Sequence, residues 1–307
     1  MKIGVTLIKL PVILRSAFLV CLGLNYVSWC NAETASELAA LYKEIDRGAS
    51  ISLSGKPIFV TSDVVENRFA ADAYGIVGSE FDDVVEELTV PANWCQFVPL
   101  NFNVKACTHQ ARDNRFSLTF YAGRKFYETP DKAYQLHYDY AIKNRSDDYV
   151  RIVLSADAGP MGTTNYRIEL DAIPVGSDTF LRIHSSYDSS FLSRLATDVY
   201  LATLGSDKVG FTVVGNTETG EPIYIGGVKG VVERNAMRYY LALQAYLDTC
   251  KLPPDSRFEA RIQSWFDLSE VHATQLHELD REEYLESKRM ERLNQQKLQQ
   301  ALNGAGG

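Results

Sequence analysis

Hydrophobic and polar residues alternate along the middle of the chain, from about residue 104 to residue 188. A period of two is typical of strands that bury one face and expose the other. Turn-forming residues interrupt the alternation at 144–148, 158–162 and 174–178. The pattern predicts a meander of antiparallel strands near 104–108, 115–123, 133–143, 148–156, 163–173 and 178–188.

Helical and extended segments flank this meander. Before it, the sequence predicts strands near 57–63 and 67–78 and helices at Ser36–Arg47, Glu80–Leu88 and Ala92–Leu100. After it, a period of 3.6 residues predicts a helix at Ser190–Thr203 and a long helix at Val228–Cys250. The short segment 210–214 between them is expected to be a further strand.

The predicted sheet has one apolar face. Its residues include Phe116, Leu118, Phe120, Leu136, Tyr138, Tyr140, Ile152, Leu154, Tyr166, Ile168, Leu170, Leu181, Ile183 and Tyr187. The other face carries Arg151, Arg167, Glu169, Arg182 and His184, which we expect to form ordinary surface pairs across strands. An apolar face needs a cover, because apolar surface is stabilised when it leaves water.

The long helix is the expected cover. One stripe of it consists of Val228, Val232, Asn235, Ala236, Tyr239, Leu243, Tyr246 and Cys250. This stripe should lie across the sheet, with Leu241 on the opposite side of the helix.

The order of these elements over residues 50–250 resembles the helix-grip architecture of the START-related, or SRPBCC, superfamily in exported bacterial proteins. Trp94-Cys95, Gly226-Gly227 and the segment Glu233–Leu243 carry the resemblance, the last looking like the terminal helix of such domains. The resemblance implies an α+β fold at 33–252, with a curved antiparallel sheet wrapped around the long helix. It also implies a cavity for a lipid, sterol, polyketide or other apolar molecule.

Residues 253–307 form a C-terminal helical extension to that domain. A first helix would carry Phe258, Ile262, Trp265 and Phe266, and a second, highly polar helix would run from about Ser269 to Leu302, followed by a flexible tail. The leucines of the second helix do not fall on one face of it. This favours a solvated helix over a coiled-coil zipper that binds a protein partner.

The first thirty residues differ in kind from the rest, because they contain no acidic residue. Lys2, Lys9 and Arg15 precede a short apolar run at Ser16–Leu24. Cys30 and Ala32 then provide small residues at the −3 and −1 positions, which suits cleavage after Ala32. We therefore expect residues 1–32 to be a signal peptide and the protein to be periplasmic or secreted. A membrane anchor is the alternative, but Arg15 leaves the apolar run too short to span a bilayer.

Charge and cysteine content limit the partners. The net charge of −8 lacks the basic footprint of a nucleic-acid-binding protein. After removal of the signal peptide, Cys95, Cys107 and Cys250 remain, and in an oxidising compartment Cys95 and Cys107 are expected to form a disulfide. Three buried thiols are the alternative. The cysteine and histidine spacing does not suit zinc, so we expect no metal or cofactor.

No residue is assigned a catalytic role. The chain has no Gly-x-Ser-x-Gly motif, and His272 and His277 lie too far apart around a helix to share a metal. The favoured function is an exported binding protein for a lipid or another apolar small molecule. The alternatives are a cyclase- or hydrolase-like enzyme on the same fold and a non-catalytic interaction or scaffold protein.

The predicted ligand-binding residues lie on the apolar face and on the long helix. They are Phe120, Leu136, Tyr138, Ile152, Leu154, Tyr166, Ile168, Ile183, Asn235, Tyr239 and Leu243. Asn235 would either bond to nearby backbone or, with Tyr138 or Tyr166, orient the polar end of the ligand. That ligand is expected to be uncharged or weakly polar, because no lysine or arginine clearly falls on this face. A filled core without a cavity is the alternative.

If residues 1–32 are a signal peptide, the exported protein begins at Glu33. N-terminal sequencing of the protein recovered from the periplasm or medium checks this prediction. A mature protein that still carries Lys2 or Lys9 would contradict it.

Overall fold

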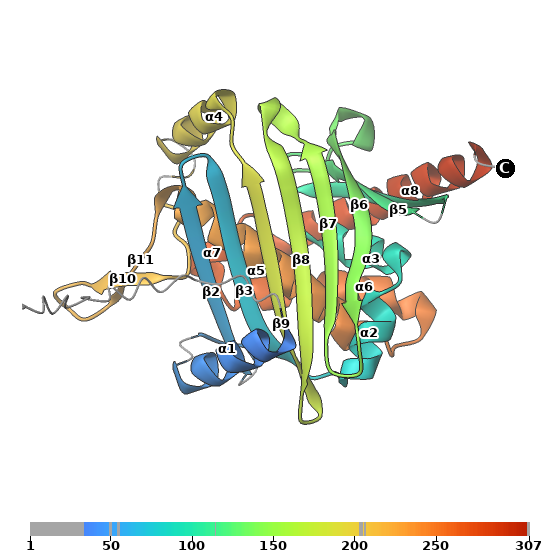
Figure 1. Ribbon diagram of the computed structural model, residues 1–307. Helices are drawn as coiled ribbons and strands as arrows, with labels where there is room; N and C mark the ends of the chain where they lie inside the picture. Colours follow the sequence, from blue (N-terminus) through green and yellow to red (C-terminus); the bar gives the residue numbers. More distant parts are fainter. Residues whose placement is uncertain are drawn as a thin grey trace, which may run out of the picture. The chain divides into compact units, whose positions relative to one another are not determined.

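The alternating segments form one curved antiparallel sheet (Figure 1). The computed structural model describes residues 34–48, 51–53, 56–113, 115–202, 205 and 207–305. The expected signal peptide at 1–32 and the final glycines of the expected tail, Gly306 and Gly307, lie outside the described residues.

The described strands of the sheet lie in the order β1-β2-β3-β9-β8-β7-β6-β5-β4. Their bounds are β1 (Ile51–Leu53), β2 (Lys56–Val65), β3 (Arg68–Val77), β4 (Val104–Arg112), β5 (Arg115–Ala122), β6 (Tyr134–Arg145), β7 (Val150–Ala158), β8 (Thr164–Val175) and β9 (Asp178–Asp188). The meander predicted from alternation is therefore confirmed. Its last strand pairs with β3, which joins the meander to the N-terminal strands.

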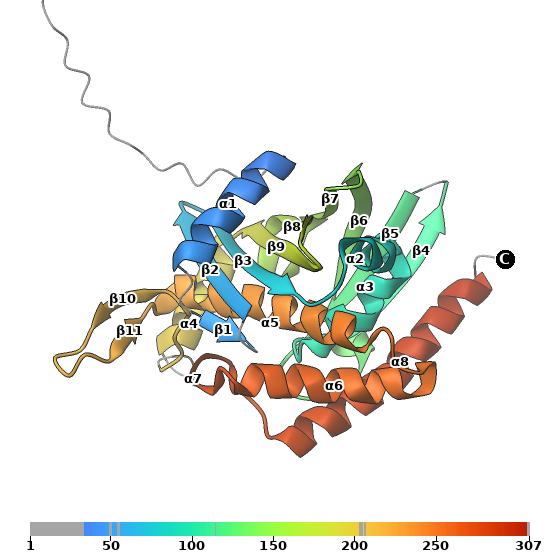
Figure 2. The same cartoon turned by 90° about the horizontal axis from the view of Figure 1, so that it is seen from below.

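Helices lie on both faces of the sheet (Figures 1 and 2). The long helix α5 (Gly227–Thr249) lies along the inner face, and α1 (Ala35–Gly48) packs on the outer face. The remaining elements are α2 (Phe81–Leu88), α3 (Pro91–Phe97), η1 (Val98–Leu100), η2 (Pro130–Lys132), η3 (Pro160–Gly162), α4 (Phe191–Ala202), β10 (Val213–Asn216), β11 (Pro222–Tyr224), α6 (Pro254–Glu270), α7 (Ala273–Leu276) and α8 (Arg281–Ala305). This α+β arrangement is the helix-grip fold.

Other elements pack against α5 on more than one side, and not along a single stripe. On the sheet side, the ring of Tyr240 lies against β3, where a Cβ at Gly75 would come within 2.1 Å of the tyrosine hydroxyl. On another side, the indole N–H of Trp265 in α6 donates to the carbonyl oxygen of Arg238 at 3.2 Å. Leu241 and Leu243 are both 0% exposed. The expectation that Leu241 lies on a less important side of the helix is therefore wrong, because α6 forms a second layer there.

The C-terminal region joins the main hydrophobic core and is not a solvated extension. Leu276, Leu279 and Tyr284 are buried in the same cluster as the inner face of the sheet. The predicted continuous helix from Ser269 to Leu302 is broken, since α6 ends at Glu270 and α8 begins at Arg281. The break turns Tyr284 inward, where its ring stacks on Trp265 with centroids 4.9 Å apart.

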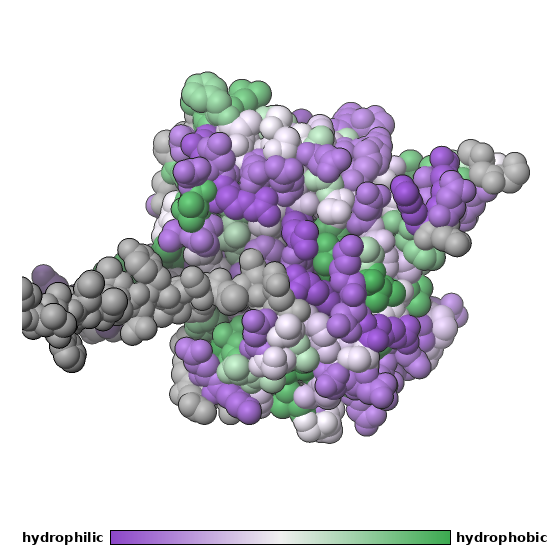
Figure 3. All heavy atoms as spheres, in the orientation of Figure 1, coloured by the Kyte–Doolittle hydropathy of each residue, from purple (hydrophilic) through white to green (hydrophobic). Residues whose placement is uncertain are grey.

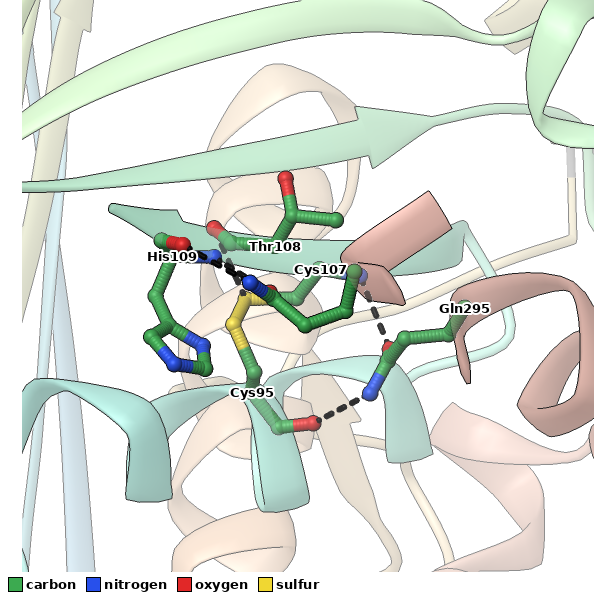
Figure 4. Close-up of a disulfide and its surroundings, with 6 residues drawn as sticks. Cys95, Cys107, Thr108, His109 and Gln295 are labelled. Carbon is green, nitrogen blue, oxygen red and sulfur yellow. Dashed lines mark hydrogen bonds between the residues drawn. A yellow bond between two sulfur atoms is a disulfide. The ribbon is translucent and has the colours of Figure 1, made fainter. Parts of the chain in front are cut away.

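Glutamines of α8 form hydrogen bonds with backbone groups of β4, the strand at the edge of the sheet. Gln295 accepts a hydrogen bond from the backbone N–H of Cys107 at 2.8 Å and donates to the carbonyl oxygen of Cys95 at 3.0 Å (Figure 4). Gln299 accepts from the N–H of His109 at 2.9 Å and donates to its carbonyl oxygen at 3.0 Å. An exposed strand edge invites pairing with other chains. The glutamine-rich segment therefore serves as a partner for β4.

A buried ion cluster also fixes α8 to β4. Glu291 lies 3.0 Å from the ammonium of Lys105 and 2.6 Å from that of Lys288. Lys288 also donates to the carbonyl oxygens of Asn101 and Val104. Burial lowers the pKa of Lys288 to about 8.

The predicted disulfide is confirmed. Cys95 of α3 and Cys107 of β4 are bonded (Figure 4). The bridge ties a helix on the inner face to the edge strand. Cys250 is free and buried, and this burial raises the pKa of its thiol.

Three of the charged residues predicted on the outer face, Glu169, Arg182 and His184, are buried, which differs from the prediction. Arg182 bonds to Asp72 at 2.7 Å and to Asp171 at 2.9 Å, and His184 Nδ1 lies 3.0 Å from Asp72. Glu169 pairs with Arg151 at 2.7 Å. These ion pairs form a network and are not ordinary surface contacts.

Figure 3 shows mostly hydrophilic residues over the outer face and a hydrophobic area over α4. The exposed apolar side chains of α4 include Phe191, Leu192 and Leu195. No helix within the described ranges is long and apolar enough to cross a bilayer.

The burial of α5 on all sides predicts that Leu241→Ala and Leu243→Ala destabilise the protein to a similar extent. Each change removes a fully buried side chain and should cost about 2–5 kcal/mol of unfolding free energy. Leu293→Ala on α8, where the leucine is 58% exposed, is the control and should cost less than about 0.5 kcal/mol. Urea unfolding measures all three. A loss for Leu241→Ala as small as the control would contradict the two-layer packing.

Candidate ligand-binding cavity

A cavity of about 160 Å³ lies between the inner face of the sheet and α5. Strands β5, β6, β8 and β9, the loop before β4, and α5 contribute its walls. The lining residues are Asn101, Asn103, Val104, Phe120, Ala122, Leu136, Tyr138, Tyr166, Arg167, Ile168, Ser185, Ser186, Tyr187, Val232, Asn235 and Tyr239. The walls are mainly apolar, with several hydroxyl and amide groups among them.

Most of the predicted ligand-binding residues line this cavity. They are Phe120, Leu136, Tyr138, Tyr166, Ile168, Asn235 and Tyr239. Ile152, Leu154, Ile183 and Leu243 are buried but do not line it. Ile183 borders a void of only about 10 Å³, together with Trp94 and Phe97 of α3. The bulky rings of α3 therefore fill this end of the inner face.

Several lining residues were missed by the sequence-based prediction. Ser185 alternates with Ile183 and Tyr187 on β9, so the strand period would have found it. Asn101 and Asn103 lie in an irregular loop, where no period indicates which way a side chain points. Arg167 belongs to the outer face by alternation, but the pairing of β8 with β9 shifts register between Thr164 and Arg167.

Tyrosine hydroxyls provide much of the polarity of the cavity. Tyr138, Tyr166 and Tyr239 all line the cavity. Tyr166 also stacks on Tyr187, with centroids 5.1 Å apart, and its hydroxyl bonds to Thr163 at 2.8 Å. The hydroxyls of Tyr138 and Tyr239 have no hydrogen-bond partner among the described residues. Hydroxyls that line a cavity and lack protein partners can bond to a ligand or to water inside it.

Burial fixes the protonation state of these phenols. It raises the pKa of Tyr239 to about 12 and that of Tyr138 well above its ordinary value. Both groups are therefore neutral at physiological pH and can donate a hydrogen bond to an acceptor.

Asn235 lies on α5 at the cavity wall. Its Oδ1 accepts a hydrogen bond from Nη1 of Arg238 at 3.5 Å. Within the described chain it makes no bond to a strand or loop backbone, which was the structural alternative for this residue. A guanidinium has only donors, so it orients the amide with the oxygen toward Arg238 and the Nδ2 donor away from it.

Positive charge lies closer to the cavity than the sequence indicated. Arg167 lines the wall and pairs with Glu169, and Arg238 lies directly behind Asn235. The expectation that no arginine is near the ligand-binding face is therefore wrong. Alternation along a strand does not reveal Arg238, because the residue lies on α5.

The sheet order and the position of α5 decide the architecture. The chain has a helix-grip fold, in which the curved antiparallel sheet wraps around α5. No family model and no curated protein sequence matches it.

Solved structures similar to this chain include two lipid transfer proteins and one synthase. The STAR-related lipid transfer protein of Xanthomonas axonopodis is 15% identical, over 50% of this chain and 89% of that chain, with a TM-score of 0.35. Human StAR-related lipid transfer protein 5 is 13% identical over 56% and 88%, with a TM-score of 0.30. Truncated norcoclaurine synthase from Thalictrum flavum is 11% identical over 48% and 87%, with a TM-score of 0.30.

Proposed function

We propose that this START-like protein binds a small apolar molecule that has one hydrogen-bonding end. The observation that carries the proposal is a mainly apolar cavity into which polar groups without protein partners project. Ligand sites in proteins typically combine apolar walls with a few placed polar groups. Here Leu136, Ile168 and Val232 supply apolar wall, and the hydroxyls of Tyr138 and Tyr239 supply donors.

The volume of the cavity limits the size of the ligand. The cavity of about 160 Å³ is close to the engineered apolar cavity of about 150 Å³ that accepts benzene. It is smaller than the roughly 300–1,000 Å³ of most ligand pockets. It therefore suits a single ring or a short acyl chain, or one end of a longer lipid. A sterol or a two-chain lipid would require the cavity to widen.

The groups around the cavity suit binding better than proton abstraction. The ionisable residues among its described walls are tyrosines and Arg167. The raised pKa values of Tyr138 and Tyr239 leave no phenolate at neutral pH to act as a general base. These groups can still donate hydrogen bonds and so orient a bound acceptor.

Export is part of the same proposal. The acid-free N-terminal segment with its short apolar run supports cleavage after Ala32. The disulfide between Cys95 and Cys107 suits an oxidising compartment such as the periplasm or the medium. We propose that the ligand is bound in that compartment.

Filling the cavity provides the test. Ser185→Leu places an isobutyl group into the space from β9, whereas Ser155→Leu makes the same change at an exposed position on β7. Benzyl alcohol is a suitable probe, because it combines one ring with one hydroxyl, and calorimetry measures its affinity. We expect binding at one site in wild type and Ser155→Leu, and a loss of at least about tenfold in Ser185→Leu.

Two results would overturn the proposal. One is the absence of saturable binding in the wild-type protein. The other is an unchanged affinity in Ser185→Leu, provided that circular dichroism shows a folded variant. Because the new side chain fills a void, Ser185→Leu is expected to unfold at a temperature no lower than that of Ser155→Leu.

A further inference from the structure

Positive charge gathers behind one wall of the cavity, in a protein whose net charge is −8. Lys125, Lys208 and Arg238 all pair with a single carboxylate, Glu278, at 3.3, 3.7 and 3.2 Å. Arg234, one helical turn before Arg238, adds a further buried cation. We call these residues, Lys125, Lys208, Arg234, Arg238 and Glu278, the Glu278 cluster. Its ion pairs leave more positive than negative charge.

Arg238 connects the cluster to the cavity. Its side chain is only 5% exposed, and its guanidinium lies 4.6 Å from the ring centroid of Phe102. Phe102 stands between Asn101 and Asn103, which both line the cavity. On its other side, Arg238 donates to Oδ1 of Asn235 at 3.5 Å. The guanidinium is thus held one side chain away from the cavity.

This contact determines what Asn235 offers to a ligand. Because Oδ1 faces the guanidinium, the Nδ2 donor is the part of the amide left for the cavity. The hydroxyls of Tyr138 and Tyr239 are donors as well. These groups can all donate to a ligand end that accepts hydrogen bonds, and the charge behind them favours a negative one.

We propose that the ligand ends in a carboxylate, held by the Asn235 amide with Arg238 behind it, and that its body is a ring or a short acyl chain. This inference rests on the proposed function and names the class of its ligand. Arg238 acts as a positioning residue, because it orients Asn235 and contributes charge without lining the cavity. Arg167 lines the wall, but it belongs to the network in which Asp72, Glu169 and Asp171 match the charges of Arg151, Arg167 and Arg182.

The lowered pKa of Arg238 indicates that nearby negative charge does not fully stabilise its protonated form. Burial and repulsion by Arg234 lower the pKa of Arg238 to about 10, although Glu278 acts in the opposite direction. A carboxylate next to Asn235 would relieve part of this repulsion, since charges interact strongly at short range in a protein interior.

Two probes of the same shape separate charge from fit. Phenylacetate and phenylacetamide share the ring and a carbonyl acceptor, and only phenylacetate is charged near pH 7. Calorimetry on the full exported chain should show that phenylacetate binds about tenfold more tightly than phenylacetamide. The ratio of the two affinities reports on charge recognition, and a merely structural role of Arg238 would not change it.

Two substitutions test whether Arg238 causes the preference for phenylacetate over phenylacetamide. Arg238→Met keeps an apolar stem over Phe102, and Glu278 keeps Lys125 and Lys208 as partners, so the fold should survive. The preference for phenylacetate should fall to about onefold in this variant. Lys143→Met, at an exposed lysine on β6, removes the same charge elsewhere and should leave the preference unchanged.

Asn235→Asp is the second variant, because it is isosteric and keeps a partner for Arg238. The new carboxylate should neutralise Arg238 and abolish the preference, while phenylacetamide still binds. Equal affinities of the two probes in wild type, or an unchanged preference in both variants, would overturn the carboxylate inference and leave the proposed function standing. Failure of both probes to bind would overturn the two together.

Discussion

The structure depends on one helix being packed on all sides. Helix α5 covers the inner face of the sheet, and α6 and the C-terminal segments cover α5 in turn. The carboxylate of Glu233 shows how tightly the helix is held. One of its oxygens accepts hydrogen bonds from the backbone N–H groups of Phe211 and Thr212, and the other accepts one from Ser62 of β2 at 2.7 Å. A charge this deeply buried is tolerated only with such a complete set of donors.

The cavity exists because the space beneath α5 is filled unevenly. Toward α3, the rings of Trp94 and Phe97 close the gap between helix and sheet and leave only about 10 Å³. Toward the other end, β9 contributes the small side chains of Ser185 and Ser186 beside Tyr187, and the loop before β4 contributes asparagines. Small and polar side chains leave both room and hydrogen-bonding capacity, which a core of leucine and isoleucine would not. The same helix therefore holds the fold together at one end and borders the cavity at the other.

Alternation and helical period were sufficient to predict the strands of the meander and α5. Both signals arise where one face of an element is apolar and the other is polar. They fail for the part of α8 beyond Leu285, because the side chains that fix this part to β4 are polar. Lys288, Gln295 and Gln299 bond to the backbone of β4 or of the loop before it, and no hydrophobic seam records these contacts. For this reason, the sequence pattern predicted a solvated helix for this segment.

The site was predictable to the extent that its residues follow the strand period. Tyr138 and Ile168 were found in this way, whereas Ile152 shares the inward face but is covered by other side chains. Filling of this kind depends on contacts between distant segments, which no local pattern contains. Arg238 illustrates the same limit, since its influence on the cavity passes through Asn235 and through a loop more than a hundred residues earlier in the chain.

We propose that a ligand binds in the space between α5 and the sheet. Nuclear Overhauser contacts between phenylacetate ring protons and methyl-labelled protein test it most directly. We expect contacts to the methyl groups of Ile168, Val232 and Leu136, which line the cavity. We expect none to Ile173, which is buried on the opposite face of the sheet beneath α1. Contacts confined to the exposed apolar side chains of α4, with none to the cavity methyl groups, would contradict it.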